Sequence, residues 1–185
     1  GLRPIVDVAT ASFIFQAFSQ VVNEAANIHY MTGGQTRVPL VLHVNHGIRG
    51  GGAAQHSHSP QAMLWNTPGL QIMTPSTPRD VRGLIHTAVA SDNPVLWADH
   101  VKLFDLTGPL PDEPEAIPFG VADIKRAGTD VTIVATSYMV ARALAAALEH
   151  EGPFDLILVG RNSVDADTGQ VGPQLAQLLD LPFAT

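Results

Sequence analysis

The chain is organised around two neighbouring runs, the apolar Val38-Pro-Leu-Val-Leu-His-Val44 and the glycine-rich Gly50-Gly-Gly-Ala-Ala-Gln-His-Ser-His-Ser59. The first run predicts a buried strand. The glycines that follow lack a Cβ, so the backbone there can approach a ligand or another subunit closely. Strands that lead into polar, glycine-rich loops commonly build sites at the carboxyl end of an α/β sheet. These residues therefore favour an α/β protein with a site at this loop. The alternative is a glycine turn with solvated histidines.

Composition limits the class of protein. The 185 residues include 10 Lys and Arg against 17 Asp and Glu, which gives a net charge of −7, and 45% are hydrophobic. This is enough for one domain or slightly more, with a real core. The acidic balance without a basic patch argues against nucleic acid as a partner. The absence of cysteine excludes disulfides, thiolate catalysis and cysteine-based zinc sites. No apolar run reaches the length of a membrane span, and the first residues lack a signal-peptide layout, so we expect a cytoplasmic protein without a membrane partner.

Strand and helix patterns alternate along the first hundred residues. Apolar runs at 3–8, 38–44, 69–73 and 94–98 predict strands. Helices are expected over 12–30, 60–65 and 78–90, with Ser12 as N-cap of the first and Thr77 as N-cap of the last. Repeated strand–helix units with short connections predict a parallel sheet that helices cover on both faces.

The second half of the chain has a different composition. Residues 107–119 carry four prolines and three acidic residues without periodicity, which is typical of a domain boundary. Beyond it, 130–136 and 155–160 predict strands, and 137–150 and 173–179 predict helices. We therefore expect a division into 1–110, 111–150 and 151–185, in which a second α/β unit begins after the boundary.

Seven short motifs carry a family resemblance. They are Gly1-Leu-Arg-Pro4, Tyr30-Met-Thr-Gly-Gly-Gln35, Ala54-Gln-His-Ser57, Pro68-Gly-Leu70, Pro75-Ser-Thr-Pro78, Asp92-Asn-Pro94 and Thr129-Asp-Val-Thr-Ile-Val134. Their order and spacing resemble the beta subunit of 2-oxoacid dehydrogenase decarboxylating components, which are thiamine-diphosphate enzymes of the transketolase superfamily. The resemblance implies that 1–110 is a pyrimidine-binding domain lacking its N-terminal part. It also implies that 111–150 is a linker and the start of the transketolase C-terminal domain.

The same resemblance implies site residues. Phe13 matches the aromatic residue that packs against the aminopyrimidine ring, and His56 matches the catalytic histidine at the substrate end of the cofactor. The positions that match a structural potassium site, built largely from carbonyl oxygens, are Leu40, Ala88, Val89, Ser91 and Asn93. The implied cofactors are thus thiamine diphosphate with Mg²⁺, and K⁺, although Ser91 replaces an acid expected there. The alternatives are a Phe13 that only packs on the apolar side of its helix and a His56 that only bonds loop backbone.

Two parts of the family's active site fall outside this sequence. In the family, the glutamate that activates the thiamine pyrimidine precedes the position of Gly1, and the diphosphate- and magnesium-binding domain lies on the alpha subunit. General acid–base catalysis needs the glutamate within hydrogen-bond reach of the ring. We therefore expect a chain that is inactive alone. It needs an alpha-type subunit, or another chain, that supplies the glutamate and the diphosphate-binding domain.

The last part of the chain has another resemblance. Phe154-Asp-Leu-Ile-Leu-Val-Gly-Arg-Asn-Ser-Val-Asp-Ala-Asp-Thr-Gly-Gln-Val-Gly-Pro173 resembles the beta subunit of electron-transfer flavoprotein, in which this segment holds an adenine nucleotide. The resemblance implies that 151–185 binds FAD or AMP through Gly160, Arg161, Asn162, Ser163, Asp165, Asp167, Thr168, Gly169, Gln170 and Val171. A polar loop that leads into a helix N-terminus suits phosphate or ribose hydroxyls. The alternative is an acidic surface loop.

Together the two resemblances suggest a function. The hypothesis is a subunit of a thiamine-diphosphate-dependent, transketolase-like or 2-oxoacid dehydrogenase-like enzyme that forms a thiamine-bound acyl or ketol unit. A flavin would withdraw two electrons, and a lipoyl, coenzyme A or carrier-protein thiol would accept the acyl group, with the cofactors carrying the chemistry. One alternative is a fragment of an ordinary 2-oxoacid dehydrogenase beta subunit. The other is a non-catalytic module for adenine-nucleotide binding or assembly.

Overall fold

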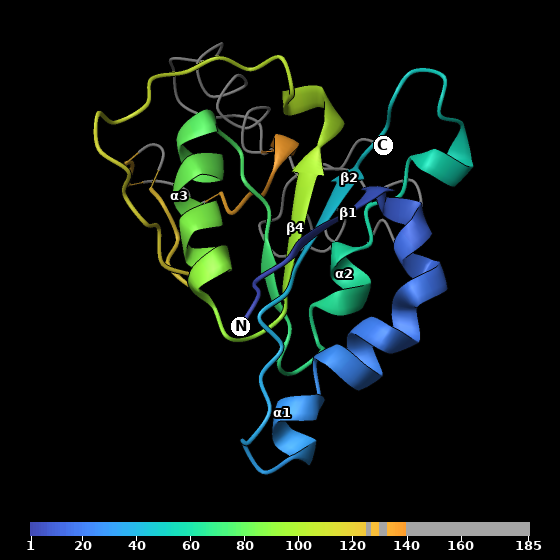
Figure 1. The fold of residues 1–185 in the computed structure, drawn as a ribbon. Helices are drawn as coiled ribbons and strands as arrows, with labels where there is room; N and C mark the ends of the chain where they lie inside the picture. Colours follow the sequence, from blue (N-terminus) through green and yellow to red (C-terminus); the bar gives the residue numbers. More distant parts are fainter. Residues whose placement is uncertain (125–126, 130–132, 140–185) are drawn as a thin grey trace.

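A parallel four-stranded sheet forms the centre of the protein (Figure 1). The computed structural model describes residues 1–124, 127–129 and 133–139. The strands are β1 (Ile5–Thr10), β2 (Val41–His46), β3 (Gln71–Met73) and β4 (Val95–His100), in the order β1-β2-β4-β3. All neighbouring pairs are parallel, and the structure therefore confirms the parallel α/β fold expected from the sequence.

One face of the sheet packs against the helical segment that follows β1. This segment consists of the 3-10 helix η1 (Ala11–Ala17), the π-helix η2 (Gln20–Ala25) and the short α1 (Ile28–Met31). The helix α2 (Gln61–Leu64) lies on the same side, as Figure 1 shows. The core between these layers contains Ala11, Ile14, Val21, Leu42, Val44, Leu64, Leu96 and Ala98. Fully burying one of the larger of these side chains stabilises the fold by roughly 1.5–3 kcal/mol.

The opposite face packs against α3 (Pro78–Ala90), where a smaller core contains Val41, Met73, Ala88 and Val95. The predicted start of this helix is confirmed. The Thr77 side chain accepts a hydrogen bond from the Asp80 backbone N–H, and the Asp80 carboxylate accepts one from the Thr77 N–H. This capping box satisfies two N–H groups that the first turn of a helix leaves without partners. Pro78 adds a backbone angle that already suits a helix start.

Two of the differences from the predicted element boundaries have an evident physical cause. Ser12 is not an N-cap, because its hydroxyl bonds His58 and the chain enters η1 at Thr10 without a side-chain cap. The predicted strand 38–44 begins only at Val41. Pro39 has no N–H to donate to a strand ladder, and the Val38 N–H bonds the Asp92 carbonyl outside the sheet.

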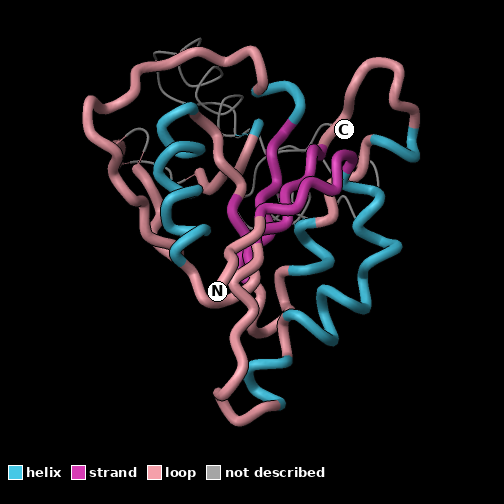
Figure 2. Tube along the Cα trace, viewed as in Figure 1, coloured by secondary structure: helices cyan, strands magenta, loops and turns pink. Residues whose placement is uncertain are grey.

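The proline-rich segment 107–119 is bound to α3 rather than extended away from it. In Figure 2 the long loop after β4 wraps around this helix. The Ile117 N–H donates to the Gly83 carbonyl at 3.1 Å, and the Thr87 hydroxyl donates to the Ile117 carbonyl at 2.6 Å. A Cβ at Gly83 would overlap the Ile117 side chain, so glycine permits this close approach. The division of the chain into three parts stays a prediction.

The segment after the proline-rich loop corrects one prediction. Residues 133–136 form no strand, although 130–136 was expected to be one. Ile133 is 49% exposed and Val134 is 90% exposed, and no described strand pairs with them. Helical structure begins at Tyr138, within the helix predicted over 137–150. The remainder of that helix, and the elements predicted over 155–160 and 173–179, lie outside the described residues. Within the described part of the chain, no helix is both long enough and apolar enough to span a membrane.

Candidate functional site

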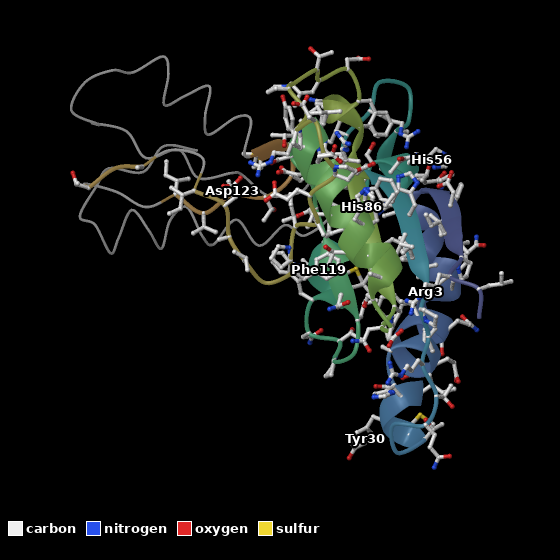
Figure 3. All side chains as sticks on the ribbon, turned by 60° about the vertical axis from the view of Figure 1, so that its left-hand side comes forward. Arg3, Tyr30, His56, His86, Phe119 and Asp123 are labelled. Carbon is white, nitrogen blue, oxygen red and sulfur yellow. The ribbon has the colours of Figure 1, made fainter. Side chains whose placement is uncertain are left out.

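A loop at the carboxyl end of β2 carries the candidate catalytic histidine (Figure 3). Gly47 begins the loop with φ +90°, a conformation that favours glycine, and a Cβ there would overlap the His100 ring. The Gly47 N–H donates to the His58 carbonyl at 3.2 Å and thereby closes the loop at its base. The one-turn 3-10 helix η3 (Ala54–His56) then brings His56 towards η1.

The structure brings together the two residues predicted to contact the thiamine cofactor. The Phe13 and His56 ring centroids lie 5.5 Å apart, with the rings nearly perpendicular at 82°. This edge-to-face arrangement is a favourable one for aromatic rings. Phe13 is 46% exposed, so part of its ring remains free for another contact. The roles of the two residues toward a cofactor stay predictions.

A second aromatic–histidine pair lies beside the first. The Phe15 and His58 ring centroids lie 5.4 Å apart at 86°. His58 Nδ1 also forms a 2.7 Å hydrogen bond with the Ser12 hydroxyl. This pair was not predicted from the sequence, although the spacing of the residues indicates it. Phe13 and Phe15 have the same two-residue spacing as His56 and His58, so each segment presents matched partners to the other.

A buried histidine at the end of β2 and a half-buried one at the end of β4 form another polar group that was not predicted from the sequence. His46 is 3% exposed, and its ring nitrogens form 3.1 Å hydrogen bonds with the Ser59 and Ser137 hydroxyls. Its ring packs edge-on against His100, whose other neighbour is the stacked ring of Tyr138. The end of the sheet thereby contacts residues 137–138 of the following segment.

The environment of these two histidines keeps them neutral. Loss of solvent on burial, with a smaller contribution from the neighbouring His100, lowers the pKa of His46 from 6.5 to about 3. Burial and the nearby Lys102 lower the pKa of His100 to about 4. A neutral imidazole can accept one hydrogen bond and donate another, which suits His46, whose ring nitrogens lie beside two hydroxyls and the Gln61 amide nitrogen.

His43, on the face of β2 opposite to His46, shows the reverse effect. It contacts the carboxylates of Asp99 at 3.3 Å and Asp7 at 3.2 Å, and the Trp97 indole donates to Asp99 at 2.7 Å. The hydrogen bond to Asp99 is the main cause of a raised pKa at His43, and it outweighs the opposing effect of burial. This group is well partnered and partly exposed, and it lies on the inner strand β2 between Asp7 of β1 and Trp97 of β4.

Four buried polar side-chain atoms have no hydrogen-bond partner in the described part of the protein. They are Asn45 Oδ1, Arg49 Nε, His56 Nδ1 and Gln61 Oε1. All four belong to residues 45–61, which comprise the end of β2, the histidine loop and the start of α2. Buried polar atoms are nearly always hydrogen-bonded in complete proteins, and leaving one without a partner costs roughly 1–3 kcal/mol. The loop therefore has buried polar groups that a ligand, ordered water or another part of the protein could partner.

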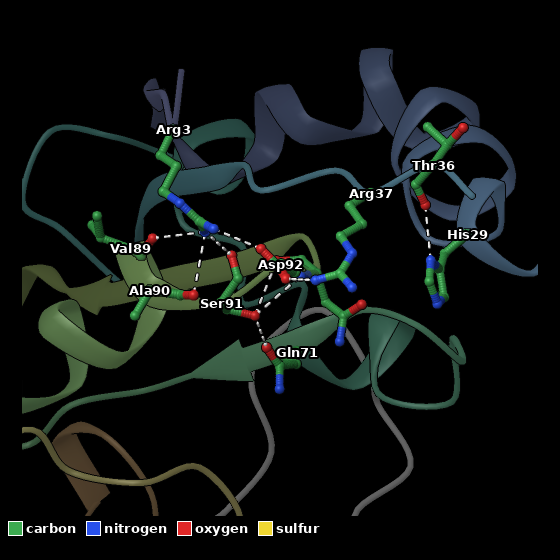
Figure 4. A network of polar contacts seen from close by, with 10 residues as sticks. Arg3, His29, Thr36, Arg37, Gln71, Val89, Ala90, Ser91 and Asp92 are labelled. Atoms are coloured by element: carbon green, nitrogen blue, oxygen red, sulfur yellow. Dashed lines mark hydrogen bonds and ion pairs between the residues drawn. The ribbon is translucent and has the colours of Figure 1, made fainter. Parts of the chain in front are cut away.

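The residues predicted for potassium lie at or next to the end of α3 and the starts of β2 and β4, and Figure 4 shows two of them, Val89 and Ser91. Each of their carbonyl oxygens already accepts a hydrogen bond. The donors are backbone N–H groups at Leu40 and Ala88, the Arg3 guanidinium at Val89 and Ser91, and the Ser91 hydroxyl at Asn93. In the described residues, no group of three or more His, Asp and Glu side chains is placed to hold a metal ion.

A cavity of about 310 Å³ lies on the other side of the sheet end, between the N-terminus of α3 and β4. Val81, His100, Phe104 and Leu106 are among the residues that line it. Phe13 and His56 do not line it, so this cavity does not coincide with the predicted cofactor position. The residues predicted to hold an adenine nucleotide, 160–171, lie outside the described residues.

Comparison with known proteins relates both halves of the chain to families. A model of the transketolase pyrimidine-binding domain matches residues 7–103, and a model of the electron transfer flavoprotein domain matches residues 108–185. A split gene transketolase, solved as an inactive beta4 tetramer, has a TM-score of 0.55 at 22% identity and covers 80% of this chain and 45% of its own. That likeness supports the fold.

Three curated relatives are beta subunits. Pyruvate dehydrogenase E1 component subunit beta of Rickettsia felis is 44% identical over 147 residues, which are 80% of this chain and 45% of that protein. Acetoin:2,6-dichlorophenolindophenol oxidoreductase subunit beta of Cupriavidus necator is 41% identical, over 82% of this chain and 46% of that protein. 2-Oxoisovalerate dehydrogenase subunit beta of Bacillus subtilis is 39% identical, over 82% and 47%. The chain thus spans about half the length of the curated relatives it matches.

Proposed function

The chain belongs to the transketolase pyrimidine-binding domain family, and from this we propose that it is the beta-type part of a thiamine-diphosphate-dependent enzyme acting on a 2-oxoacid or a related ketone. One observation carries the proposal. The exposed Phe13 ring contacts the His56 ring beside a loop in which four buried polar atoms have no hydrogen-bond partner among the described residues. Such a cluster at the carboxyl end of a parallel sheet is where α/β proteins bind ligands.

The residues of this chain would contribute binding and orientation. Thiamine diphosphate, when bound, supplies the electron sink for cleavage beside a carbonyl group. The free part of the Phe13 ring offers an apolar surface for the pyrimidine end of the cofactor, and His56 lies against the edge of the same ring. The buried and unpartnered Nδ1 of His56 fits a site completed by a ligand or another chain. In this proposal His56 orients the substrate and exchanges a proton with it.

A second chain completes this enzyme. The relatives are named as beta subunits. We propose an alpha-type subunit as the source of the diphosphate-binding domain with its Mg²⁺. Phe13 and Phe15 are 46% and 37% exposed beside the histidine loop, and they offer an apolar surface next to the proposed site.

Purification of the full chain from its own cells tests this proposal. We expect an alpha-type subunit and thiamine diphosphate to co-purify with it, as identified by mass spectrometry and by fluorescence of oxidised thiamine. The purified assembly should reduce 2,6-dichlorophenolindophenol in the presence of a 2-oxoacid. Phe13→Ala should keep the protein partner and lose thiamine diphosphate, whereas the matched variant Phe15→Ala should retain the cofactor. Equal loss from both variants, or an assembly without thiamine diphosphate, would refute the assignment.

The match of residues 108–185 to the electron transfer flavoprotein domain favours an added flavin step. We propose that residues 160–171 hold FAD or AMP, that FAD accepts two electrons from the substrate, and that a lipoyl, coenzyme A or carrier-protein thiol takes the acyl group. Replacing Thr168 and Gln170 together with Ala should weaken FAD or AMP binding by about 1–3 kcal/mol. Thiamine diphosphate binding should not change, because none of the residues proposed to bind it is altered. Loss of both ligands would indicate misfolding, and loss of neither would leave an ordinary beta-type fragment.

A further inference from the structure

We infer that the guanidinium of Arg3 is the resident cation at the C-terminal end of α3, in the place where the family resemblance implies potassium (Figure 4). Arg3 Nη1 donates to the carbonyl oxygens of Val89 at 3.1 Å, Ala90 at 3.2 Å and Ser91 at 2.6 Å. Two of these three residues, Val89 and Ser91, are among those expected around the metal ion. The domain would then fold without potassium.

The physical basis is the end of the helix. The last carbonyl groups of an α-helix have no partner within the helix, and their aligned dipoles give that end a partial negative charge. A cation with N–H donors placed there both supplies hydrogen bonds to these carbonyl groups and neutralises the partial negative charge. All three carbonyl contacts come from Nη1, which carries two hydrogens, so at least one hydrogen is shared between two carbonyl oxygens, and Nη2 bonds Asp92. Arg3 precedes β1, so the contact also joins the first strand to the end of α3.

Asp92 holds the guanidinium in position. Its carboxylate accepts a 2.6 Å bond from Arg3 Nη2 and a second bond from Arg37 Nη1. The bond from Arg3, followed by that from Arg37, lowers the pKa of Asp92 below its usual value. The side chains of Arg3 and Asp92 are 39% and 36% exposed, so solvent screens the ion pair itself. The three carbonyl contacts therefore carry the inference, and the ion pair serves to orient Arg3.

A potassium ion does not fit beside this arrangement. An ion bound to the Ser91 oxygen would lie within a few ångströms of the Arg3 nitrogen that bonds the same oxygen at 2.6 Å, where like charges repel. Each of the other expected oxygens uses one of its two lone pairs for a donor, namely a backbone N–H at Leu40 and at Ala88 and the Ser91 hydroxyl at Asn93, so the positive charge of Arg3 is what opposes the ion. The position expected for a metal is thus already supplied with donors and with positive charge.

Thermal unfolding of the full 185-residue chain tests the inference. The chain is compared in potassium, sodium and choline chloride at the same ionic strength of about 0.1 M, so that general screening is equal. We expect the same Tm in all three salts for the unsubstituted chain. Arg3→Ala should lower the Tm in choline by roughly 2–8 °C, and potassium should restore part of this loss by binding the exposed carbonyl groups. A Tm of the unsubstituted chain that rises specifically with potassium would overturn the inference.

Two further variants keep the test decisive if Arg3→Ala does not fold. Arg37→Ala removes the other guanidinium from Asp92 and leaves the helix carbonyl groups untouched, so its Tm should not depend on potassium. Arg3→Lys keeps the positive charge but loses the second nitrogen, which bonds Asp92, so we expect a lowered Tm that is still independent of potassium. A potassium response in either variant, or an Arg3→Ala chain as stable as the unsubstituted one, would show that Arg3 is not the resident cation.

Discussion

Replacing His46 with glutamine should make the protein less sensitive to acid. In the folded protein His46 is 3% exposed and bonds the hydroxyls of Ser59 and Ser137, and burial lowers its pKa to about 3. In the unfolded chain the pKa is 6.5. Between pH 6.5 and about 3, His46 therefore binds a proton in the unfolded chain but not in the folded chain. The free energy of unfolding falls as the pH falls below 6.5. Glutamine is neutral at every pH, so the variant should lack this contribution.

The size of the effect follows from the difference between the two pKa values. At about pH 5, roughly 1.5 units below the unfolded-state pKa, protonation stabilises the unfolded chain by about 2 kcal/mol. The folded state gains almost nothing at that pH, because its pKa of about 3 lies well below. At about pH 7 neither state is substantially protonated at His46. The loss of unfolding free energy between these two pH values should thus be smaller by about 2 kcal/mol in His46→Gln than in the unsubstituted chain.

Urea unfolding at the two pH values measures this difference, and His86→Gln is the matched control. His86 lies exposed on α3, so its replacement removes a histidine without touching the buried cluster. Comparing the pH effect within each variant separates it from any loss of packing, which would appear equally at both pH values. If His46→Gln and the unsubstituted chain lost the same free energy between the two pH values, the assignment of His46 as a buried neutral group would be wrong.

Three other substitutions test contacts that position the site. Thr77→Ala should cost about 0.5–2 kcal/mol in urea unfolding because the capping box of α3 is lost, and Thr77→Ser should restore most of it. Gly47→Ala should destabilise by at least about 1–2 kcal/mol from its backbone conformation alone, with an added clash against His100, and an unchanged Tm would contradict the loop geometry. Ser12→Ala should cost about 1 kcal/mol in urea unfolding and shift the imidazole NMR signals of His58, whose 2.7 Å hydrogen bond it removes. Unchanged His58 signals would mean that the contact does not exist in solution.

Local patterns predicted the features that neighbouring residues determine. Thr77, Pro78 and Asp80 lie within four positions and specify the start of α3 among themselves, so the sequence signal was sufficient. The strands were also predicted from local apolar runs. The strand predicted over 38–44 nevertheless begins only at Val41, because Pro39 has no N–H for the strand ladder. The candidate pair of Phe13 and His56 came from a family resemblance, and the structure brought the two rings together.

Contacts between distant parts of the chain were the ones that sequence reasoning missed. The hydrogen bond of His46 with Ser137 joins residues 91 positions apart, and that of Ser12 with His58 joins residues 46 positions apart. No helical or strand period connects such positions, because each bond depends on how the layers stack. His46 also breaks the simple rule that polar residues lie outside, since its partners make burial acceptable. The predicted strand over 130–136 failed over its described part because a strand pattern needs a neighbouring strand as well.

The two ends of the sheet are held by groups of opposite character, and this determines how the protein responds to acid. Before β1, Arg3 and Asp92 stay charged under mild acid, since the pKa of Asp92 is lowered by its two arginine partners. At the carboxyl end, His46 and His100 must stay neutral to keep their buried contacts. Acid therefore acts against the end of the sheet that carries the histidine loop and contacts residues 137–138, and the amino end is spared. The proposed cofactor site lies at that carboxyl end. The fall in unfolding free energy that His46 causes at low pH therefore destabilises the part of the sheet that supports the site. The pH dependence of unfolding in His46→Gln measures this contribution.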